Sequence, residues 1–501
     1  MSMISLSNIT FYYPGSYEPV FQHLSAHLDT DWHLGLTGRN GRGKTTLLRL
    51  LLGSQHKEYG LTDYQGSIVS QAPFCFFPMP VEDSWEPAFV VAQQFCPNAQ
   101  DWELRRQLGL LELDEDTLWR PYALLSGGEK TKLQLAALFL QEGAFPLIDE
   151  PTNHLDLEGR RTVAQFLQKQ RGFLMVSHDR TFLDGCVDHI LSLDRDGIQL
   201  RQGNFSGWYQ DYQTRVQSER EQNERLKKEI HRLEAAARRT AQWSDRVEAT
   251  KIGQGPCDRG NIGHKAAKMM KRSKSIEARQ QGAIEEKKQL LRSVENVGAL
   301  KLQPLDHFAR KLVEVQDLAV CYDGKPVCEP LRLEVYQGEK ICLQGTNGCG
   351  KTSLLRLVAG EQLEYTGTLT MASGLKISVV PQDTTGLSGN LSDYLEKEEV
   401  DLSRCLSILR NLGFERRQFE IPLEQYSQGQ KKKVLIARSL CQQAHLYLWD
   451  EPLNYIDLFS RLQIEQLLQQ QSAAMLFVEH DAAFCQTVAT RILTVTRRKQ
   501  A

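Results

Sequence analysis

The chain has 501 residues, with 60 Lys and Arg, 62 Asp and Glu, and a formal net charge of −2. This length exceeds what one hydrophobic core organises and fits two or three domains. No run of about 20 apolar residues occurs, which argues against a membrane-spanning helix, and residues 1–11 lack the basic start and apolar run of a secretory signal. The eleven cysteines include no Cys-x-x-Cys pair, which favours reduced thiols over a disulfide framework or a zinc site. We therefore expect a soluble, cytoplasmic protein.

The first motif along the chain is a glycine-rich loop, Gly38-Arg-Asn-Gly-Arg-Gly-Lys-Thr45, between an apolar run at 32–37 and an apolar helical stretch at 47–52. Strand, loop and helix in this order match a P-loop, whose backbone N–H groups surround phosphate. Its lysine adds a point charge, and its last hydroxyl can ligate Mg²⁺. The candidate phosphate-binding residues are Gly38, Asn40, Gly41, Gly43, Lys44, Thr45 and Thr46, of which Thr45 is also a candidate metal ligand.

Further motifs follow in the first half. Gln71 ends a predicted strand and is placed to reach a metal or a water. Leu125-Ser-Gly-Gly-Glu129 begins a predicted helix at 130–141 with the pattern of a capping box. An apolar strand then ends in Asp149, which suits a Mg²⁺ shell, and Glu150, which can orient or deprotonate a water. After an Asn153-His-Leu-Asp156 loop, a strand at 173–177 delivers His178. Each motif alone also has a structural explanation, but their order and spacing indicate a nucleotide site.

This ordered set resembles the ATP-binding-cassette (ABC) ATPase domain and covers residues 3 to about 203. The resemblance implies that ATP and Mg²⁺ are cofactors, that Tyr13 (or Tyr12) stacks on adenine, and that His178 is the catalytic switch histidine. It also implies that Gln71 and the signature residues Ser126, Gly127 and Gly128 contact ATP. Gln71 and Asp149 would share the metal with Thr45.

The second half repeats the first, which indicates an internal duplication. Its matching strand at 312–322 ends in Tyr322, and its P-loop, acidic pair, Asn454–Asp457 loop and switch His480 follow in the same order. The corresponding ATP-binding candidates are Tyr322, Gly345, Asn347, Gly348, Gly350, Lys351, Thr352, Ser353, Gln382, Ser427, Gly429, Gln430 and Asp450. Thr352, Gln382 and Asp450 are the metal candidates, and Glu451 and His480 are the catalytic ones.

The copies differ in the signature, which reads Tyr426-Ser-Gln-Gly-Gln430 in the second half. In the family two domains pair head to tail, so each ATP lies between one P-loop and the other domain's signature. The resemblance thus implies one site that uses Lys44, Glu150 and Ser427, and another that uses Lys351, Glu451 and Ser126. We expect both sites to hydrolyse ATP, at unequal rates.

Between the two halves lies a long charged linker, with 20 Lys and Arg against 13 Asp and Glu over residues 209–300. Residues 209–250 contain no proline or glycine, and apolar residues recur at steps of three or four, which marks one helical face. Such a helix would extend on the order of 60 Å. A second apolar stripe follows a glycine-rich interruption, so the pattern predicts an antiparallel coiled-coil hairpin. The predicted class is α/β: ABC domains at 1–207 and 305–501, joined by a helical hairpin at 208–304.

The hairpin tip, at about 251–274, is densely basic. Like charges repel at this spacing, so their concentration around a turn favours contact with phosphate, and structured RNA is recognised largely through shape and phosphate. A solvated turn without a partner is the alternative. The RNA- or ribosome-contacting candidates are Lys251, Arg259, His264, Lys265, Lys268, Lys271, Arg272 and Lys274.

Tandem cassettes with such a linker and no membrane segment resemble the ABC-F translation proteins, and residues 263–274 resemble the linker of the Lsa- and Vga-type ribosome-protection proteins. The resemblance implies a monomeric chain whose cassettes pair head to tail. Its partners would be the 70S ribosome, 23S rRNA and P-site tRNA, with no membrane. The linker would point to the peptidyl-transferase centre and protect against lincosamides, pleuromutilins and streptogramin A. The alternatives are a housekeeping ABC-F factor without a drug role and an ABC ATPase of transport or DNA repair.

Overall fold

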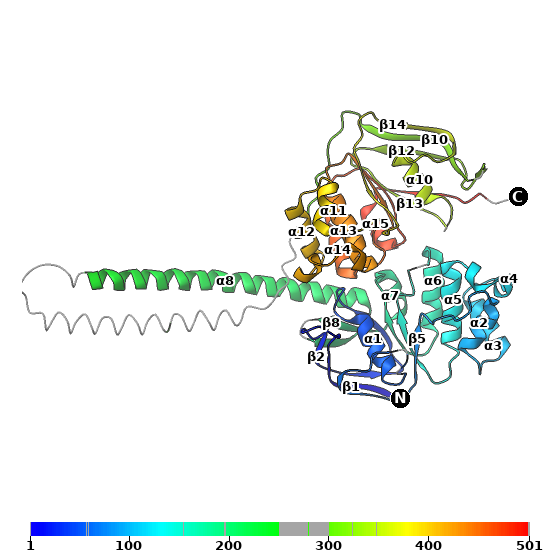
Figure 1. Cartoon of the computed structure of the whole chain (residues 1–501), viewed down its shortest axis with the longest axis horizontal. Coiled ribbons are helices and arrows are strands. Elements are labelled where there is room, and N and C mark those ends of the chain that lie inside the picture. The colour runs from blue at the N-terminus through cyan, green and yellow to red at the C-terminus, as the bar shows by residue number, and fades with distance from the viewer. Residues whose placement is uncertain are drawn as a thin grey trace, which may run out of the picture. The chain divides into compact units, whose positions relative to one another are not determined.

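The computed structural model describes residues 2–56, 58, 60–153, 155–194, 197–249, 279, 300–322, 324–346 and 348–498, with the side chains of 220 and 236–249 excepted. It divides into two units, one made of Met1–Ser206 with Gly298–Ala501 and the other of Gly207–Val297. The first unit contains two α/β cassettes (Figure 1). Asn347 and the basic candidates between 251 and 274 lie outside the described residues.

The first cassette begins with a strand hairpin and continues with alternating strands and helices. Its strands are β1 (Met3–Phe11), β2 (Phe21–Asp29), β3 (His33–Thr37), β4 (Gln65–Ser70), β5 (Phe74–Phe77), β6 (Phe145–Asp149), β7 (Phe173–Val176), β8 (His189–Asp194) and β9 (Gly197–Gln202). Its helices are α1 (Lys44–Gly53), α2 (Ala88–Phe95), α3 (Asp101–Leu110), α4 (Glu115–Trp119), η1 (Tyr122–Leu124), α5 (Gly127–Leu138), α6 (Leu157–Gln168) and α7 (Arg180–Cys186).

The second cassette repeats this order. Its strands are β10 (Lys311–Tyr322), β11 (Lys325–Pro326), β12 (Leu331–Tyr336), β13 (Lys340–Gln344), β14 (Tyr365–Met371), β15 (Ile377–Val380), β16 (Leu446–Asp450), β17 (Met475–Val478) and β18 (Arg491–Thr494). Its helices are α10 (Lys351–Val358), α11 (Leu391–Lys397), α12 (Leu402–Asn411), η2 (Arg416–Phe419), η3 (Leu423–Gln425), α13 (Gln428–Cys441), α14 (Leu458–Gln470) and α15 (Ala482–Val488).

Each cassette combines an antiparallel sheet with a parallel one. The parallel sheets have the orders β5-β6-β7-β3-β8, extended by the antiparallel β9, and β15-β16-β17-β13-β18. The antiparallel sheets have the orders β2-β1-β4 and β11-β10-β12, with β14 also paired to β10. Because parallel strands end at one edge, the loops after β3, β6 and β7 meet there, as do those after β13, β16 and β17.

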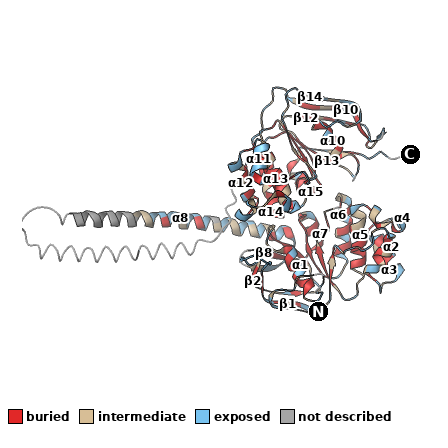
Figure 2. Cartoon of the chain, viewed as in Figure 1, coloured by how far each residue is buried: buried red, intermediate tan, exposed pale blue. Residues whose placement is uncertain are grey.

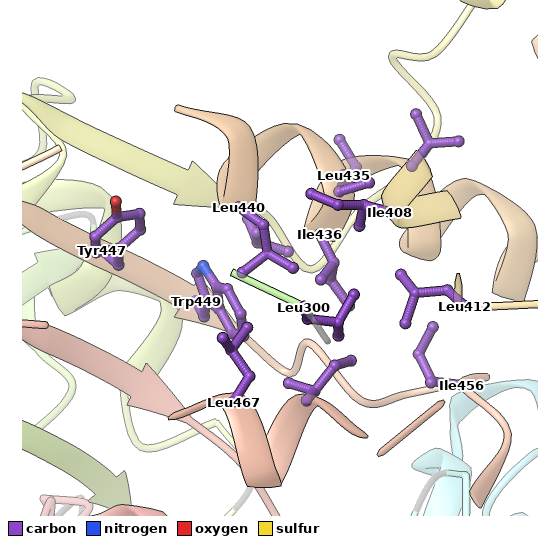
Figure 3. Packing of buried hydrophobic residues seen from close by; sticks show 14 of the residues in the cluster. Leu300, Ile408, Leu412, Leu435, Ile436, Leu440, Tyr447, Trp449, Ile456 and Leu467 are labelled. Atoms are coloured by element: carbon purple, nitrogen blue, oxygen red, sulfur yellow. The ribbon is translucent and has the colours of Figure 1, made fainter. Parts of the chain in front are cut away.

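The parallel strands are buried on both faces, so their sequences are continuous apolar runs. In the second cassette Trp449 and Tyr447 of β16 are fully buried, in one cluster with Leu435, Ile436 and Leu440 of helix α13 (Figure 3). Both cassettes follow the same pattern, with buried residues along the strands and exposed ones on the outer helix faces (Figure 2). Full burial of an apolar side chain such as Leu440 or Ile436 stabilises the folded state by about 1.5–3 kcal/mol.

The predicted first linker helix is confirmed as α8 (Phe205–Ala249). Its predicted partner helix lies outside the described residues, so the hairpin stays a prediction. Among the helices that the structure describes, none is both long and apolar enough to cross a membrane. The cysteines within the same ranges are free thiols.

A buried ion pair joins α13 to the start of α14 in the second cassette. Lys433 Nζ lies 2.5 Å from Asp457 Oδ2, and both side chains are almost fully buried. Asp457 also caps α14 by accepting a hydrogen bond from the Ser460 N–H. Removing one partner of such a pair leaves the other charge buried and uncompensated, which costs far more than a surface pair contributes.

We predict that Asp457→Asn destabilises the protein by about 3–5 kcal/mol, because the Lys433 ammonium would keep its burial and lose its counter-charge. Asp156→Asn is the matched control: Asp156 caps α6 in the same way but is less buried, and Asn caps as well as Asp, so the cost should stay below about 1 kcal/mol. Denaturant unfolding followed by circular dichroism measures both. Equal losses in the two variants would contradict the role given to the ion pair.

Candidate ATP-binding sites

Each P-loop lysine begins a helix at the end of a central parallel strand. Lys44 follows Gly43, whose φ of 90° is left-handed, and a Cβ there would lie 2.6 Å from Val20, so a side chain is excluded. The Lys44 ammonium donates to the carbonyl oxygens of Gly38 at 2.7 Å and Arg39 at 3.3 Å. Burial lowers the pKa of Lys44. The loop therefore already surrounds a positive charge at a helix N-terminus, which is an anion-binding arrangement.

The second P-loop has the same geometry. Lys351 follows Gly350 at φ 95°, and its ammonium donates to the carbonyl oxygens of Gly345 at 2.8 Å and Thr346 at 3.0 Å. Thr45 and Thr352, the next residues in each loop, hydrogen-bond to Asp149 and Asp450. Hydroxyl and carboxylate thus meet at the same place in both cassettes.

The two predicted adenine-stacking residues are held alike. The Tyr13 hydroxyl lies 2.8 Å from Thr46 Oγ1, and the Tyr322 hydroxyl lies 2.8 Å from Ser353 Oγ. The two tyrosines remain 42% and 48% exposed, so each presents an aromatic surface beside its P-loop helix. An exposed ring that is anchored at its hydroxyl suits stacking on a base.

The acidic pairs end strands β6 and β16. Glu150 and Glu451 have left-handed φ values of 53° and 45°, which are rare for a non-glycine residue. Their backbone N–H groups donate to the carbonyl oxygens of Val176 and Val478 at 2.9 and 3.0 Å. Strained backbone of this kind is characteristic of functional sites.

The switch histidines face these glutamates. His178 Nε2 lies 3.2 Å from Glu150 Oε1, and His480 Nε2 lies 3.5 Å from Glu451 Oε1. Burial, with the Lys44 charge next, lowers the pKa of His178 well below its usual value, so its ring is neutral at physiological pH. A neutral imidazole can donate one proton to an acceptor and accept one at its other nitrogen.

The signature serines cap their helices. Ser126 Oγ accepts from the Glu129 N–H while the Glu129 carboxylate accepts from the Ser126 N–H, and Ser427 pairs with Gln430 in the same way. The altered second signature therefore keeps its capping box. Gly127 and Gly128 are the first two residues of α5, whereas Gly429 lies one residue inside α13.

The first P-loop and the second signature meet. Asn40 Nδ2 donates to the Tyr455 carbonyl oxygen at 3.3 Å, and a Cβ on Gly429 would lie 3.4 Å from Asn40 Nδ2 and 2.4 Å from that same carbonyl. Arg160 of α6 also donates to the His480 carbonyl oxygen at 3.3 Å. The contacts of Asn40 with Tyr455 and Gly429, and that of Arg160 with His480, join the two cassettes, as head-to-tail pairing requires.

The prediction that Gln71 reaches the metal ion or a water at the first ATP site is wrong. Gln71 follows β4, which pairs with β1 in the antiparallel sheet, and the next strand, β5, runs from there toward the acidic edge. Gln71 therefore lies at the opposite end of β5 from Asp149. Gln382, by contrast, follows β15, which ends beside Asp450.

Strand register identifies the residue that takes the place of Gln71. Phe74 pairs with Phe145 as Ile377 pairs with Leu446, so Phe77-Pro78-Met79 corresponds to Val380-Pro381-Gln382. Met79 therefore occupies the position of Gln382 in the first cassette. An apolar strand followed by proline occurs in both cassettes and is the sequence signal for this position, whereas a glutamine alone is not.

Gln382 in the second cassette and Met79 in the first give the two glutamates different hydrogen bonding and opposite pKa shifts. Gln382 Nε2 donates to Glu451 Oε2 at 2.9 Å. Burial would raise the pKa of Glu451, but hydrogen bonds from His480 and Gln382 outweigh it and lower that pKa. Glu150 has no such amide, and although the His178 ring lies close to it, its buried Oε1 has no hydrogen-bond partner among the described residues. Burial, followed by the Asp149 charge, raises the pKa of Glu150 to about 8.

The residues at each acidic edge fit a magnesium ion. Asp450 Oδ1 is buried without a hydrogen-bond partner among the described residues, and Thr352 bonds to this carboxylate. Carboxylate and hydroxyl oxygens, completed by phosphate, are the ligands that Mg²⁺ prefers. Thr352, Asp450 and Gln382 would hold it in the second site, whereas Thr45 and Asp149 remain in the first. A bound Mg²⁺ would neutralise charge on the transferred phosphate.

Comparison with known proteins agrees with this geometry. The family described as "ABC transporter" matches residues 21–153 and 328–454, which together span more than half of the chain. The chain belongs to this ABC family. Its two cassettes make it a tandem ABC ATPase of the ABC-F type, so ATP hydrolysis is its reaction.

The similarity to individual proteins extends over nearly the whole length of this chain. Ribosome protection protein VmlR of Bacillus subtilis is 27% identical over 99% of this chain and 87% of its own. ATP-binding protein Uup of Haemophilus influenzae is 25% identical over 98% and 78%. The archaeal ribosome recycling factor aABCE1 shares the fold, with a TM-score of 0.59 at 20% identity over 94% of this chain and 84% of that one.

We predict that the two sites hydrolyse ATP at unequal rates. Glu150→Gln should retain at least about threefold more ATPase activity than Glu451→Gln, because the second site keeps its glutamate hydrogen-bonded and ionised. Steady-state phosphate release by the two purified variants measures this difference. Equal residual rates would contradict it.

We also predict that the residue at position 79 limits the first site. Met79→Gln in a Glu451→Gln background should raise turnover about 3- to 10-fold, because an amide would donate to the unbonded Glu150 oxygen. Gln382→Met in a Glu150→Gln background should lower turnover by a similar factor. Met79→Leu adds no donor and serves as the control. A gain with leucine equal to that with glutamine would refute the hydrogen-bond explanation.

Proposed function

We propose that this ABC-F ATPase binds the 70S ribosome in its ATP-bound state, directs its linker toward the peptidyl-transferase centre and P-site tRNA, and protects the ribosome from lincosamides, pleuromutilins and streptogramin A. The observation that carries the proposal is the similarity to a ribosome protection protein over 99% of the chain, because a match of this extent includes the linker as well as the cassettes.

The described contacts support an ATP-gated mechanism. Asn40 of the first P-loop and Arg160, which bonds to the carbonyl oxygen of the candidate catalytic His480, each hydrogen-bond across the cassettes, so nucleotide at either site would favour their closed arrangement. α8 begins at Phe205, directly after the first cassette. A nucleotide switch requires that closure change the affinity for the ribosome, and hydrolysis would then permit release.

The linker supplies the charge that a ribosomal RNA partner requires. Its excess of basic over acidic residues contrasts with the acidic remainder of the chain, and phosphate contacts dominate affinity for nucleic acid. Contact of the tip residues with 23S rRNA is part of this proposal.

A housekeeping role in translation is the second candidate. Uup of Haemophilus influenzae and the probable ATP-binding protein YheS of Escherichia coli K12 match at 25% and 24% identity, close to the 27% of VmlR. Because the three identities are nearly the same, they do not distinguish a role in drug protection from another role. A measurement of drug susceptibility separates them.

Trapping the ATP-bound state tests ribosome binding. We predict that the Glu150→Gln, Glu451→Gln double variant co-sediments with 70S ribosomes in ATP and stays bound through washing, whereas the wild type is released, because the double variant lacks both candidate catalytic carboxylates. The variant with Lys44→Ala and Lys351→Ala is the control that should not bind. Free exchange of the double variant in ATP would refute the switch.

Expression in a susceptible bacterium tests protection. We predict that the wild type reduces susceptibility to lincosamides, and that Lys265→Glu with Lys268→Glu abolishes this effect, because the charge that would meet RNA phosphate is reversed. Lys227→Glu with Lys228→Glu, on exposed positions of α8, makes the same charge change away from the tip and is the matched control. Unchanged susceptibility on wild-type expression would favour the housekeeping role.

A further inference from the structure

The altered signature of the second cassette makes a contact that a glycine could not make. Gln428 occupies the position of Gly127, and its Oε1 accepts a hydrogen bond of 2.6 Å from Thr384 Oγ1. Thr384 is 5% exposed, whereas Gln428 is an exposed residue, so the bond is partly shielded from water on the Thr384 side. Gln428 directly follows Ser427, the cap of α13. The bond therefore holds the serine end of the signature helix.

The other end of this contact belongs to the second nucleotide site. Thr384 lies two residues after Gln382, whose side chain donates to Glu451. Lys432, 1% exposed on α13, donates to the carbonyl oxygens of Pro381 at 2.8 Å, Gln382 at 3.3 Å and Asp450 at 3.1 Å. The segment that contacts Glu451 is thus attached to α13 at two points.

The first cassette cannot form the Gln428 contact. By the strand register, Thr384 corresponds to Val81, which has no hydroxyl, and Gln428 corresponds to Gly127, which has no side chain. Its α5 instead holds the Met79 backbone through Gln134, two turns beyond the signature, and Thr131 donates to the Gly127 carbonyl of its own helix. The two cassettes therefore connect nucleotide site and signature differently.

We propose that Gln428 is a positioning residue that couples the second nucleotide site to the first, by linking the Gln382 segment to Ser427. The inference rests on the proposed pairing of the first P-loop with the second signature, and it is independent of the ribosomal role. Displacement of Gln382 at the second site moves Thr384, and Gln428 transmits that movement to the serine that faces ATP at the first site. The first cassette has Val81 and Gly127 at the matching positions, so no second contact of this kind links its Met79 segment to Ser126.

The test measures each site alone, on purified protein without ribosomes. Glu451→Gln leaves the first site active, and in that background Thr384→Val should lower kcat about 3- to 10-fold with KM changed less than about twofold, because Val keeps the shape and removes the hydrogen bond. Thr384→Ser should restore the rate. In the Glu150→Gln background, Thr384→Val should change second-site turnover by less than about twofold.

A double-mutant cycle separates coupling from static packing. In the Glu451→Gln background, Gln382→Ala should slow the first site, and its effect should be much smaller once Thr384 is replaced by Val, because only the Lys432 attachment then links the Gln382 segment to α13. Gln428→Gly should reproduce the Thr384→Val result and serves as the second variant if Thr384→Val does not fold. Thr131→Val, the matched change in α5, should leave second-site turnover unaltered.

Three outcomes overturn the proposal. Equal slowing of both sites by Thr384→Val shows a structural role only. Slowing of the second site alone refutes the pairing of P-loop and signature. Additive effects of Gln382→Ala and Thr384→Val show that the two residues act separately. Ribosome co-sedimentation is measured apart from these rates, so failure of the ribosomal proposal leaves them interpretable.

Discussion

Two adjacent carboxylates that are largely shielded from water at the end of a parallel strand are the constraint on which both nucleotide sites depend. Burial disfavours their charged forms, and the charge of one raises the pKa of its neighbour. The fold accepts this cost by ending β6 and β16 beside strands whose carbonyl oxygens bind the N–H groups of Glu150 and Glu451 and hold both residues in left-handed conformations. Acids held in this way are poised for a cationic ligand and for proton transfer.

The two cassettes stabilise that buried acid pair differently. Gln382 donates to Glu451, whereas Met79 can offer Glu150 no hydrogen at the same position. One glutamate is therefore kept ionised by the protein, while the other relies on what binds beside it. Because the strands share their register, the difference arises from a side chain and not from the fold.

Motif order predicted the cassettes, both P-loops and both acidic pairs, because glycine, lysine and acid positions in a P-loop fold follow from backbone geometry. Apolar spacing without proline or glycine predicted the first linker helix. Motif order misplaced Gln71, because a glutamine at a strand end looks the same whichever sheet the strand joins. Only pairing of β5 with β6 distinguishes the two. The contact of Gln428 with Thr384 joins residues 44 apart, and no local pattern encodes it.

Head-to-tail pairing gives a local substitution a distant consequence. The less supported carboxylate, Glu150, and the altered signature at Ser427 belong to the same composite site in that arrangement, although they come from different cassettes. A substitution in either cassette then acts on the site that already lacks an amide donor. In that pairing, the first site would combine a glutamate that lacks an amide donor with a signature that Gln428 links to the Gln382 segment. The second site keeps its supporting amide and an unmodified Ser-Gly-Gly signature. Substitutions of this kind after a duplication would make two initially equal sites hydrolyse ATP at unequal rates.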